Sequence, residues 1–331
     1  MPINRQLILK RLPSGPLSSN DFSLREAPPV GSEPLILAPR FISVDPYMRT
    51  RMQTEGYDYI EHWTSGSVIS GWTLAEVLHS NHPNWRAGDW AVGHLPMQDI
   101  VPHDGDGLWQ RAAGLPPPLE MMHPMGMTGF TAWVGMLHLG QPTANDTVLV
   151  SAAAGAVGSI AAQLARDVGA HVVVTAGRQD KREWLRNIGF TDILDHYAPD
   201  FDIQLRQALP AGISLNFENI GGRVFHAANE QMQGNGRVVV CGLVSQYQQK
   251  NPRQGPSNLA DLTRRNVKVI PFTIPSYKEN LPAFHKDMRA RLASKCLDWR
   301  LDIVPGGLAA VPAALVGVLA GENLGKRLVS C

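Results

Sequence analysis

The sequence predicts an α/β fold in which a doubly wound parallel sheet follows a β-rich first part. From about residue 125 onward, short apolar runs alternate with helical segments, which is the pattern of a parallel sheet covered by helices on both faces. Before about residue 118, short apolar runs are broken by Gly, Pro, Asn and Asp, which is typical of irregular β structure. The length of 331 residues favours about two domains.

The β-rich part contains apolar runs at residues 35–37, 68–69 and 90–92, each short enough to be a strand. The Leu-Pro-Pro-Pro stretch at residues 115–118 is expected to connect this part to the helical sequence that follows.

The first strand–helix unit of the second part, at residues 147–168, is the most informative local pattern. Its strand reads Thr-Val-Leu-Val, and the apolar positions after it recur every three or four residues, as on one helix face. The turn between them, Ala153-x-Gly155-x-x-Gly158, lacks the first glycine of the usual dinucleotide fingerprint GxGxxG. A pyrophosphate can bind the N–H groups at such a helix N-terminus, although small-residue turns also join other strands to helices.

The later elements continue this alternation. Gly169 ends the first helix, and Gly189 ends a helix over residues 180–188. Further strands are expected at residues 171–175, 192–194, 213–217, 237–241 and 267–270, and the chain ends in a strand-like run at residues 327–330.

The tip of the second strand favours NADP(H) over NAD(H). An NAD site usually places an acidic residue about twenty residues after the glycine turn. This strand instead ends in Gly177-Arg178, and Lys181 follows, so two cations are available for a 2′-phosphate. Asp180 lies nearby and is expected to cap the next helix. The alternative is that Arg178 and Lys181 are a solvated surface pair.

Composition and charge exclude several classes of protein. With 44% hydrophobic and 18% charged residues and a net charge of +1, nothing points to nucleic acid or an anionic membrane as a partner. No run of about eighteen apolar residues and no signal-like N-terminal core is present, so the cytoplasm is expected. Cys241, Cys296 and Cys331 are far apart, which argues against a disulfide framework.

No metal site is expected. No cysteine precedes residue 241, and the 11 histidines have no paired ligand spacing, so neither a structural nor a catalytic zinc site is predicted. A GxSxG motif for acyl transfer is also absent from the sequence. Gly325-Lys326 does not belong to a phosphate loop, because Gly321 is one residue too close and Arg327 replaces Ser or Thr. Activation of a carbonyl would then depend on hydrogen bonds.

A series of motifs follows in order from about residue 40 to the C-terminus. They are Asp45-Pro46-Tyr47-Met48-Arg49, Ser80-Asn81-His82-Pro83 with Gly88-Asp89-Trp90, Gly126-Met127-Thr128-Gly129-Phe130-Thr131-Ala132, residues 152–158, Phe217-Glu218-Asn219-Ile220-Gly221-Gly222, residues 241–247 and Asn323-Leu324-Gly325-Lys326. In this order they resemble the zinc-free branch of the medium-chain dehydrogenase/reductase superfamily, in particular its alkenal/one (prostaglandin, curcumin and double-bond) reductases.

The resemblance implies a division into two domains. A β-rich GroES-like catalytic domain would comprise residues 1–122 together with 292–331, and a Rossmann-type NADP(H)-binding domain would comprise residues 123–291. It also implies a homodimer and NADPH as the cofactor.

The resemblance further implies which residues contact the cofactor. The pyrophosphate turn, the 2′-phosphate site, the strand beneath the cofactor, the nicotinamide loop and the carboxamide contacts each have a counterpart. Including Arg178 from the strand tip, these residues are Gly155, Ala156, Val157, Gly158, Arg178, Lys181, Tyr197, Asn219, Cys241, Gly242, Leu243, Val244, Ser245, Gln246, Tyr247, Phe272, Thr273, Ile274 and Asn323.

Two positions depart from the family pattern. Thr128 stands where the family usually has proline, so the start of that helix is expected to differ. Residues 271–277 form a shorter and more proline-rich segment than in the bacterial relative, which affects one wall of the substrate pocket.

The implied reaction is reduction of a carbon–carbon double bond conjugated to a carbonyl. Hydride from NADPH reaches the β-carbon, the carbonyl oxygen becomes an enolate stabilised by hydrogen-bond donors, and the α-carbon is then protonated. A neutral tyrosine suits the donor role, together with the cofactor's ribose hydroxyl. Tyr277 is the first catalytic candidate and Tyr47 the second. The alternative for either tyrosine is a packing role with a satisfied hydroxyl.

The substrate is expected to be a small hydrophobic enone or enal. Tyr47, Tyr57, Tyr247 and Tyr277 could line its pocket. Two other interpretations stay open, namely an NADPH quinone reductase on the same scaffold and an NADPH-binding protein without turnover. Four apolar residues could make this pocket hydrophobic, and the simpler interpretation is that they belong to the core: Met48, Met52, Trp63 and Trp72.

Overall fold

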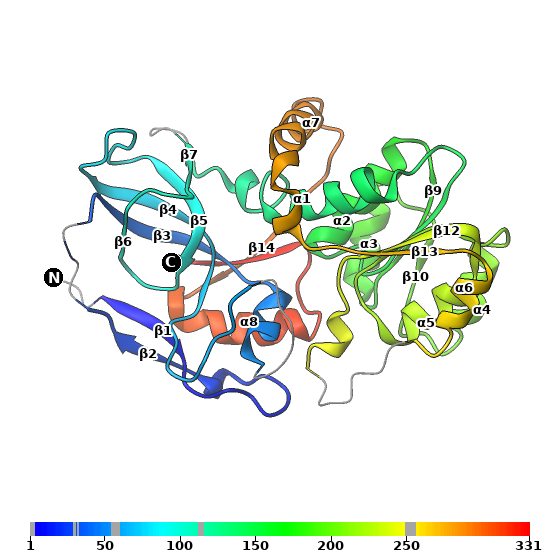
Figure 1. Ribbon diagram of the computed structural model, residues 1–331, viewed down its shortest axis with the longest axis horizontal. Coiled ribbons are helices and arrows are strands. Elements are labelled where there is room, and N and C mark those ends of the chain that lie inside the picture. Colours follow the sequence, from blue (N-terminus) through cyan, green and yellow to red (C-terminus); the bar gives the residue numbers. More distant parts are fainter. Residues whose placement is uncertain (1–3, 29–30, 32, 54–59, 112–115, 249–255) are drawn as a thin grey trace. The chain divides into compact units, whose positions relative to one another are not determined.

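The computed structural model describes residues 4–28, 31, 33–53, 60–111, 116–248 and 256–331 (Figure 1). The chain divides into two compact units, Met1–His123 with Leu301–Cys331, and Pro124–Arg300. The sequence placed the two boundaries after residues 122 and 291. The second of these falls inside helix α7 (Leu281–Ala293), all of which belongs to the unit Pro124–Arg300, so the chain leaves that unit later than expected.

The unit Pro124–Arg300 contains a six-stranded parallel sheet, and its strand order is that of a Rossmann fold. The order is β10-β9-β8-β11-β12-β13, so the chain reverses its direction of winding between β8 and β11. The strands are β8 (Thr147–Val150), β9 (His171–Thr175), β10 (Ile193–Leu194), β11 (Ile213–Glu218), β12 (Met232–Val240) and β13 (Lys268–Pro271). The predicted doubly wound parallel sheet is therefore confirmed.

Helices cover both faces of this sheet (Figure 1). Apolar side chains of three helices pack with Leu149, Val173 and Val238 of the sheet in one buried cluster. On the opposite face, a helical segment approaches Leu215 and Phe217 through two glycines. The helical elements are α1 (Met127–Trp133), the π-helix η4 (Val134–Gly140), α2 (Ala156–Asp167), α3 (Gln179–Asn187), α4 (Phe201–Ala208), α5 (Gly222–Glu230), η5 (Val244–Gln246), α6 (Leu259–Arg264), η6 (Ile274–Asn280) and α7.

The other unit is β-rich, as predicted. Its larger sheet is mostly antiparallel and has the order β14-β15-β3-β4-β5-β7, with β6 paired to β3, whereas β1 pairs with β2 separately. The strands are β1 (Arg5–Leu9), β2 (Phe22–Glu26), β3 (Leu35–Ser43), β4 (Ser70–Ser80), β5 (Trp90–Pro96), β6 (Val101–His103), β7 (Trp109–Arg111), β14 (Leu301–Pro305) and β15 (Lys326–Ser330).

The helical elements of the β-rich unit are short. They are η1 (Ser19–Asp21), η2 (Pro46–Met52), η3 (Leu119–Met122), η7 (Gly307–Ala310) and α8 (Val311–Leu319). The predicted strand at residues 68–69 differs, because Val68 makes only an isolated bridge with Ile8 and β4 begins two residues after it. Across the described residues of both units, no helix is both long and apolar enough to cross a membrane.

A buried ion pair holds two motifs of the β-rich unit together. Lys326, at the start of β15, is 1% exposed and donates to Asp45 Oδ1 at 2.6 Å and to Val44 O at 3.2 Å. The other carboxylate oxygen of Asp45 accepts from Ser43 Oγ. A buried charge is tolerated when it is paired and hydrogen-bonded, and both conditions are met here. Asp45 directly precedes η2, the helix that contains Tyr47, and Lys326 begins the strand that follows Asn323. The ion pair therefore joins these two segments.

His123 ends the first segment of the β-rich unit and is fully buried. Burial, together with the nearby Lys326 charge, lowers the pKa of His123 to about 3. The imidazole is therefore neutral in the folded protein over the whole range where an unfolded histidine gains a proton.

The neutral state of His123 lowers the free energy of unfolding as the pH becomes acidic. Between about pH 3 and pH 6.5 the unfolded chain binds one proton that folded His123 does not, so unfolding becomes easier as the pH falls through that window. From pH 7 to pH 5 the loss is about 2 kcal/mol. His123→Gln should reduce the difference between urea-unfolding free energies at these two pH values by about that amount. An unchanged difference would contradict the assignment.

Candidate functional site

The turn between β8 and α2 has the geometry of a dinucleotide turn. Gly155 is the N-cap of α2, and its N–H donates to Ala152 O at 3.0 Å. The residue with a left-handed conformation is Ala152, with φ of 50°, and not Ala153. Ala153 has ordinary backbone angles and donates its N–H to Thr175 O at 2.9 Å. The missing first glycine of the fingerprint is therefore tolerated, because that position needs no positive φ.

The first turn of α2 supplies amide donors. Gly155, Ala156, Val157 and Gly158 occupy the N-cap and the first three helical positions, where N–H groups lack an intrahelical carbonyl. At Gly158, a Cβ would overlap the carbonyl oxygen of Ala152 and lie 3.0 Å from Ala153 Cα. The helix thus begins in direct contact with the end of β8, and its free amides and dipole suit an anionic pyrophosphate.

At the tip of β9 the expected cations lie beside the turn. Arg178 is the N-cap of α3, and it donates to both carboxylate oxygens of Asp180, at 3.0 and 2.7 Å. The prediction that Asp180 caps α3 is wrong, because Arg178 occupies the N-cap position and Asp180 lies inside the first turn of the helix. The pairing with Arg178 lowers the pKa of the Asp180 carboxyl. Lys181 follows in the first turn of α3.

Tyr197 lies against the backbone of the same tip. The residue is 71% exposed, and a Cβ on Gly177 would overlap its ring in this position, so the ring lies directly on the glycine backbone. The ring of His196 packs edge-on against the Tyr197 ring, with the two ring centroids 4.5 Å apart. Burial and the charges of Lys181 and Arg182 lower the pKa of His196 to about 4. The tip therefore combines an exposed aromatic ring, a neutral imidazole and cations.

Arg182 supports this tip and was not predicted. Its Nη1 donates to Ala176 O at 3.2 Å and to Gly177 O, and it pairs with Asp195 at 2.8 Å. The sequence signal was a third basic residue one position after Lys181, which alone does not distinguish a ligand contact from a backbone clamp.

Asn219 and the loop after β12 form the other side of the edge. Asn219 Nδ2 donates to Ser151 O at 2.7 Å, so this side chain joins the ends of β11 and β8. The loop docks on the same segment, since Val244 N donates to Asn219 O at 3.2 Å and Ser245 N donates to Ile220 O at 2.9 Å.

Further hydrogen bonds lie within this loop and between the loop and Glu218. Leu243 N donates to the Tyr247 hydroxyl at 3.4 Å, and Gln246 N donates to Leu243 O at 2.9 Å. Cys241 and Gly242 donate their N–H groups to Glu218 O. Burial raises the pKa of the Cys241 thiol to about 12, so this cysteine is a neutral side chain and not a nucleophile.

The segment after β13 carries the first tyrosine candidate. Phe272 leaves the strand, Thr273 is the N-cap of η6, and Ile274 begins it. Tyr277 interrupts η6 with non-helical angles and is half-buried. Its ring meets His138 of η4 edge-on at 5.6 Å and Phe272 at 6.3 Å.

The Tyr277 hydroxyl makes no hydrogen bond within the described part of the chain. A packing tyrosine usually has a partner for its hydroxyl. An aromatic ring held by two neighbours with an unused donor is an arrangement that suits a substrate oxygen.

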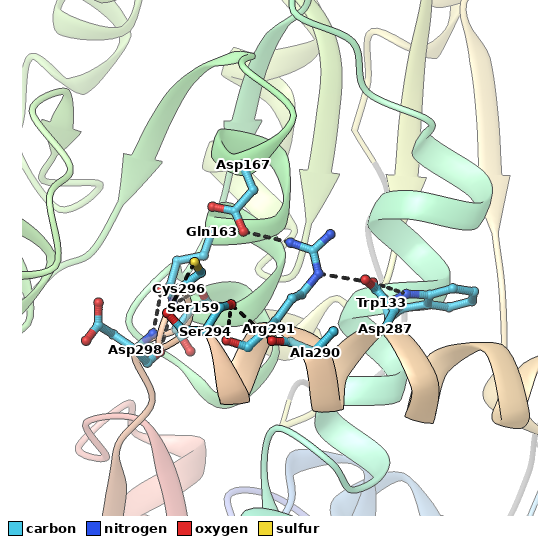
Figure 2. Close-up of polar contacts among 10 residues, drawn as sticks. All are labelled: Trp133, Ser159, Gln163, Asp167, Asp287, Ala290, Arg291, Ser294, Cys296 and Asp298. Atoms are coloured by element: carbon cyan, nitrogen blue, oxygen red, sulfur yellow. Dashed lines mark hydrogen bonds and ion pairs between the residues drawn. The ribbon is translucent and has the colours of Figure 1, made fainter.

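A set of polar contacts fixes the helix that follows Tyr277 (Figure 2). Asp287 of α7 accepts from Trp133 Nε1 at 2.9 Å and from Arg291 Nε at 3.0 Å, and Arg291 also donates to Asp167 at 2.7 Å. These contacts join α7 to α1 and to the end of α2. Trp133 in turn stacks on His138, with ring centroids 6.5 Å apart, so this neighbour of Tyr277 packs against the same set of contacts.

Gln163 fixes the chain beyond α7 (Figure 2). It is fully buried in α2, donates to Asp298 O at 2.8 Å and accepts from Asp298 N at 2.8 Å. The last turn of α7 and the chain after it are therefore bound to α2, the helix that follows the dinucleotide turn.

The second tyrosine candidate lies in the β-rich unit. The Tyr47 hydroxyl is 3.4 Å from Nε2 of His94, and Arg51 Nη1 is 3.5 Å from the same nitrogen. Partial burial and the Arg51 charge lower the pKa of His94 to about 4. Arginine can only donate, so the neutral imidazole accepts through Nε2 and the Tyr47 hydroxyl already has a partner.

The remaining predicted residues are placed as follows. Asn323 Nδ2 donates to Gly325 O at 2.8 Å, within its own turn. Met48, Met52 and Trp63 belong to the buried core of the β-rich unit, which confirms the simpler interpretation. Trp72 packs against another buried cluster of that unit. The positions beyond the described residues include Tyr57. The departure at Thr128 leaves an ordinary helix start, with Gly126 as the N-cap of α1.

Comparison with known families agrees with this geometry. A family model described as the N-terminal domain of oxidoreductase matches residues 5–110, and one described as zinc-binding dehydrogenase matches residues 156–289. NADPH-dependent curcumin reductase of Escherichia coli (strain K12) is 35% identical over 98% of this chain and 96% of its own length. The chain belongs to the alkenal/one reductase family of medium-chain dehydrogenases/reductases.

Two further relatives of this oxidoreductase are similar along their whole length. The 2-alkenal reductase (NADP(+)-dependent) of Nicotiana tabacum is 31% identical over 98% of this chain and 97% of its own. The crystal structure of CurA in complex with NADPH from Vibrio vulnificus has a TM-score of 0.93 at 34% identity, covering 98% of each chain. The cofactor named for all three relatives agrees with the NADP(H) expected from the β9 tip.

The description of the second family model names zinc as a bound metal. Among the described residues, no group of three His, Cys, Asp or Glu side chains lies close enough together to hold a metal ion.

The two glycines of the dinucleotide turn, Gly155 and Gly158, should respond differently to substitution by alanine. Gly158→Ala should lower the free energy of unfolding by about 1–3 kcal/mol, because the backbone it would overlap cannot move aside. Gly155→Ala is the matched control, since its Cβ would lie 3.2 Å from Ala152 O and its φ of −86° suits any residue. Denaturant unfolding of both variants checks this, and an equal or larger loss for Gly155→Ala would contradict it.

Proposed function

We propose that this oxidoreductase reduces the carbon–carbon double bond of α,β-unsaturated ketones and aldehydes, using NADPH. The observation that carries the proposal is the whole-length similarity to relatives named as reductases of curcumin and of 2-alkenals. The unit Pro124–Arg300 supports it, because one unit contains both the dinucleotide edge and a tyrosine with an unused hydroxyl.

The residues present fit NADPH. The amides in the first turn of α2 suit the pyrophosphate. Lys181, in the first turn of α3, is the proposed cation for the 2′-phosphate, because Arg178 is already paired with Asp180. Gly177 lies beneath the Tyr197 ring, and Asn219 with residues 241–247 borders the opposite side of the edge. When bound, NADPH supplies the hydride that reaches the β-carbon of the substrate.

Tyr277 is proposed to stabilise the enolate. As hydride adds to the β-carbon, negative charge collects on the substrate carbonyl oxygen, and a neutral phenol can donate a hydrogen bond to it. Its ring is held by Phe272 and His138, so the hydroxyl is oriented before the substrate arrives. Tyr47 is the second candidate, with a hydroxyl that would have to leave His94 to reach a substrate.

The proposal is tested by following NADPH absorbance with a panel of enals, enones, curcuminoids and quinones and identifying each product. Saturated ketones or aldehydes are expected. Hydroquinones as the efficient products would favour a quinone reductase, and tight NADPH binding with no consumption would favour a binding protein. Either result would contradict double-bond reduction.

Tyr277→Phe should lower the turnover number by about 100-fold with little change in the KM for NADPH, because it removes one donor to the enolate oxygen. Tyr47→Phe is the comparison, and a smaller loss is expected. Steady-state kinetics with a single enone separates the two. Full turnover in Tyr277→Phe would exclude this tyrosine from the mechanism.

Lys181→Ala should raise the KM for NADPH by about tenfold or more and leave the KM for NADH unchanged, because only NADPH carries the 2′-phosphate. Arg186→Ala is the control, since Arg186 is an exposed cation in the last turn of the same helix. Equal effects of Lys181→Ala on both cofactors would refute the assignment of the 2′-phosphate site.

A further inference from the structure

Two serines join β8 to β11, one at each end of the strands. At the amino end, Ser214 Oγ accepts from Thr147 N at 2.9 Å and donates to Asp146 Oδ1 at 2.6 Å. The hydroxyl accepts a hydrogen bond from a backbone N–H of the neighbouring strand and donates one to a carboxylate. Asp146 also pairs with Arg237 at 2.8 Å, so this carboxylate has a cation.

At the carboxyl end the same chemistry recurs without a cation. Ser151 Oγ accepts from Asn219 N at 2.7 Å and donates to Glu218 Oε1 at 3.0 Å. Ser151 and Glu218 are both fully buried, and no described Lys, Arg or His forms an ion pair with Glu218. Burial raises the pKa of the Glu218 carboxyl, and the hydrogen bonds that the carboxyl accepts oppose this shift.

Glu218 connects three loops through two oxygen atoms. Its Oε1 accepts from Ile220 N at 2.6 Å and Gly221 N at 2.8 Å, in addition to Ser151. Its backbone oxygen accepts from Cys241 N at 2.9 Å and Gly242 N at 3.1 Å. The ends of β8, β11 and β12 therefore meet on one residue.

We propose that Ser151 and Glu218 are a positioning pair that sets the cofactor-binding edge, whereas Ser214 and Asp146 only join the strands. This rests on the proposed use of NADPH. A dinucleotide lies across the carboxyl ends of parallel strands, at the point where the winding reverses, and that point is the β8–β11 pair. Neither Ser151 nor Glu218 reaches out to solvent, so each acts through the groups it holds, above all Asn219.

The matched serines separate positioning from stability. Ser151→Ala leaves the N–H of Asn219 without its partner, and Ser214→Ala does the same to the N–H of Thr147, so both should lower Tm by similar amounts. The dissociation constant for NADPH should rise by about tenfold for Ser151→Ala and stay within about twofold of wild type for Ser214→Ala. Fluorescence titration of the full chain with NADPH measures both.

Equal changes in NADPH affinity for the two variants, or none for Ser151→Ala, would overturn the proposal. The measurement is of binding and not of turnover. A protein that binds NADPH but leaves enones unreduced would therefore refute the proposed function without deciding this one.

The conservative variant at Glu218 gives a second test. Glu218→Gln retains an oxygen that can accept from Ser151, Ile220 and Gly221, so NADPH affinity should stay within about threefold of wild type. Glu218→Ala removes that acceptor and should weaken NADPH binding by more than about tenfold. If the two variants bind NADPH equally weakly, the accepted hydrogen bonds are not what positions the edge.

Discussion

The rest of the nucleotide-binding unit depends on one constraint, which is that polar groups buried at the carboxyl ends of its parallel strands must be hydrogen-bonded. The hydrogen bonds between neighbouring strands end where the strands end, although the backbone groups there are still buried. Glu218, Ser151 and Asn219 meet this need by bonding the ends of β8, β11 and β12 to one another. The amides in the first turn of α2 lack an intrahelical carbonyl, and they are the donors available to a pyrophosphate.

Features that depend on local sequence were predicted from it. The β8–α2 unit was predicted because apolar periodicity and a small-residue turn are set by neighbouring residues, and β9 and α3 followed for the same reason. The absence of an acid at the β9 tip pointed to NADP(H), in agreement with the cofactor named for the relatives. The assignment of the site residues, the homodimer and the location in the cell stay predictions.

Features that depend on distant partners were not predicted. In the π-helix η4, Gly135 and Gly140 lie against Phe217 and Leu215 of β11, a strand some distance along the chain. Asp180 was assigned to a cap because its competing partner, the Arg178 side chain, cannot be placed from spacing alone. Glu218 gave a usable signal, since a charged residue ends a strand whose alternate positions are apolar, but its role appears only when the three loops that it joins are seen together.

The two tyrosine candidates differ in what holds them. Tyr277 has packed rings around it and an unused hydroxyl, whereas Tyr47 already bonds to a neutral histidine. The account depends above all on where the hydride goes, and NADPH carrying deuterium at both C4 positions of the nicotinamide tests this directly. After turnover with an enone, NMR of the product should place deuterium on the β-carbon of a saturated ketone. Deuterium on the former carbonyl carbon of an alcohol would contradict the account.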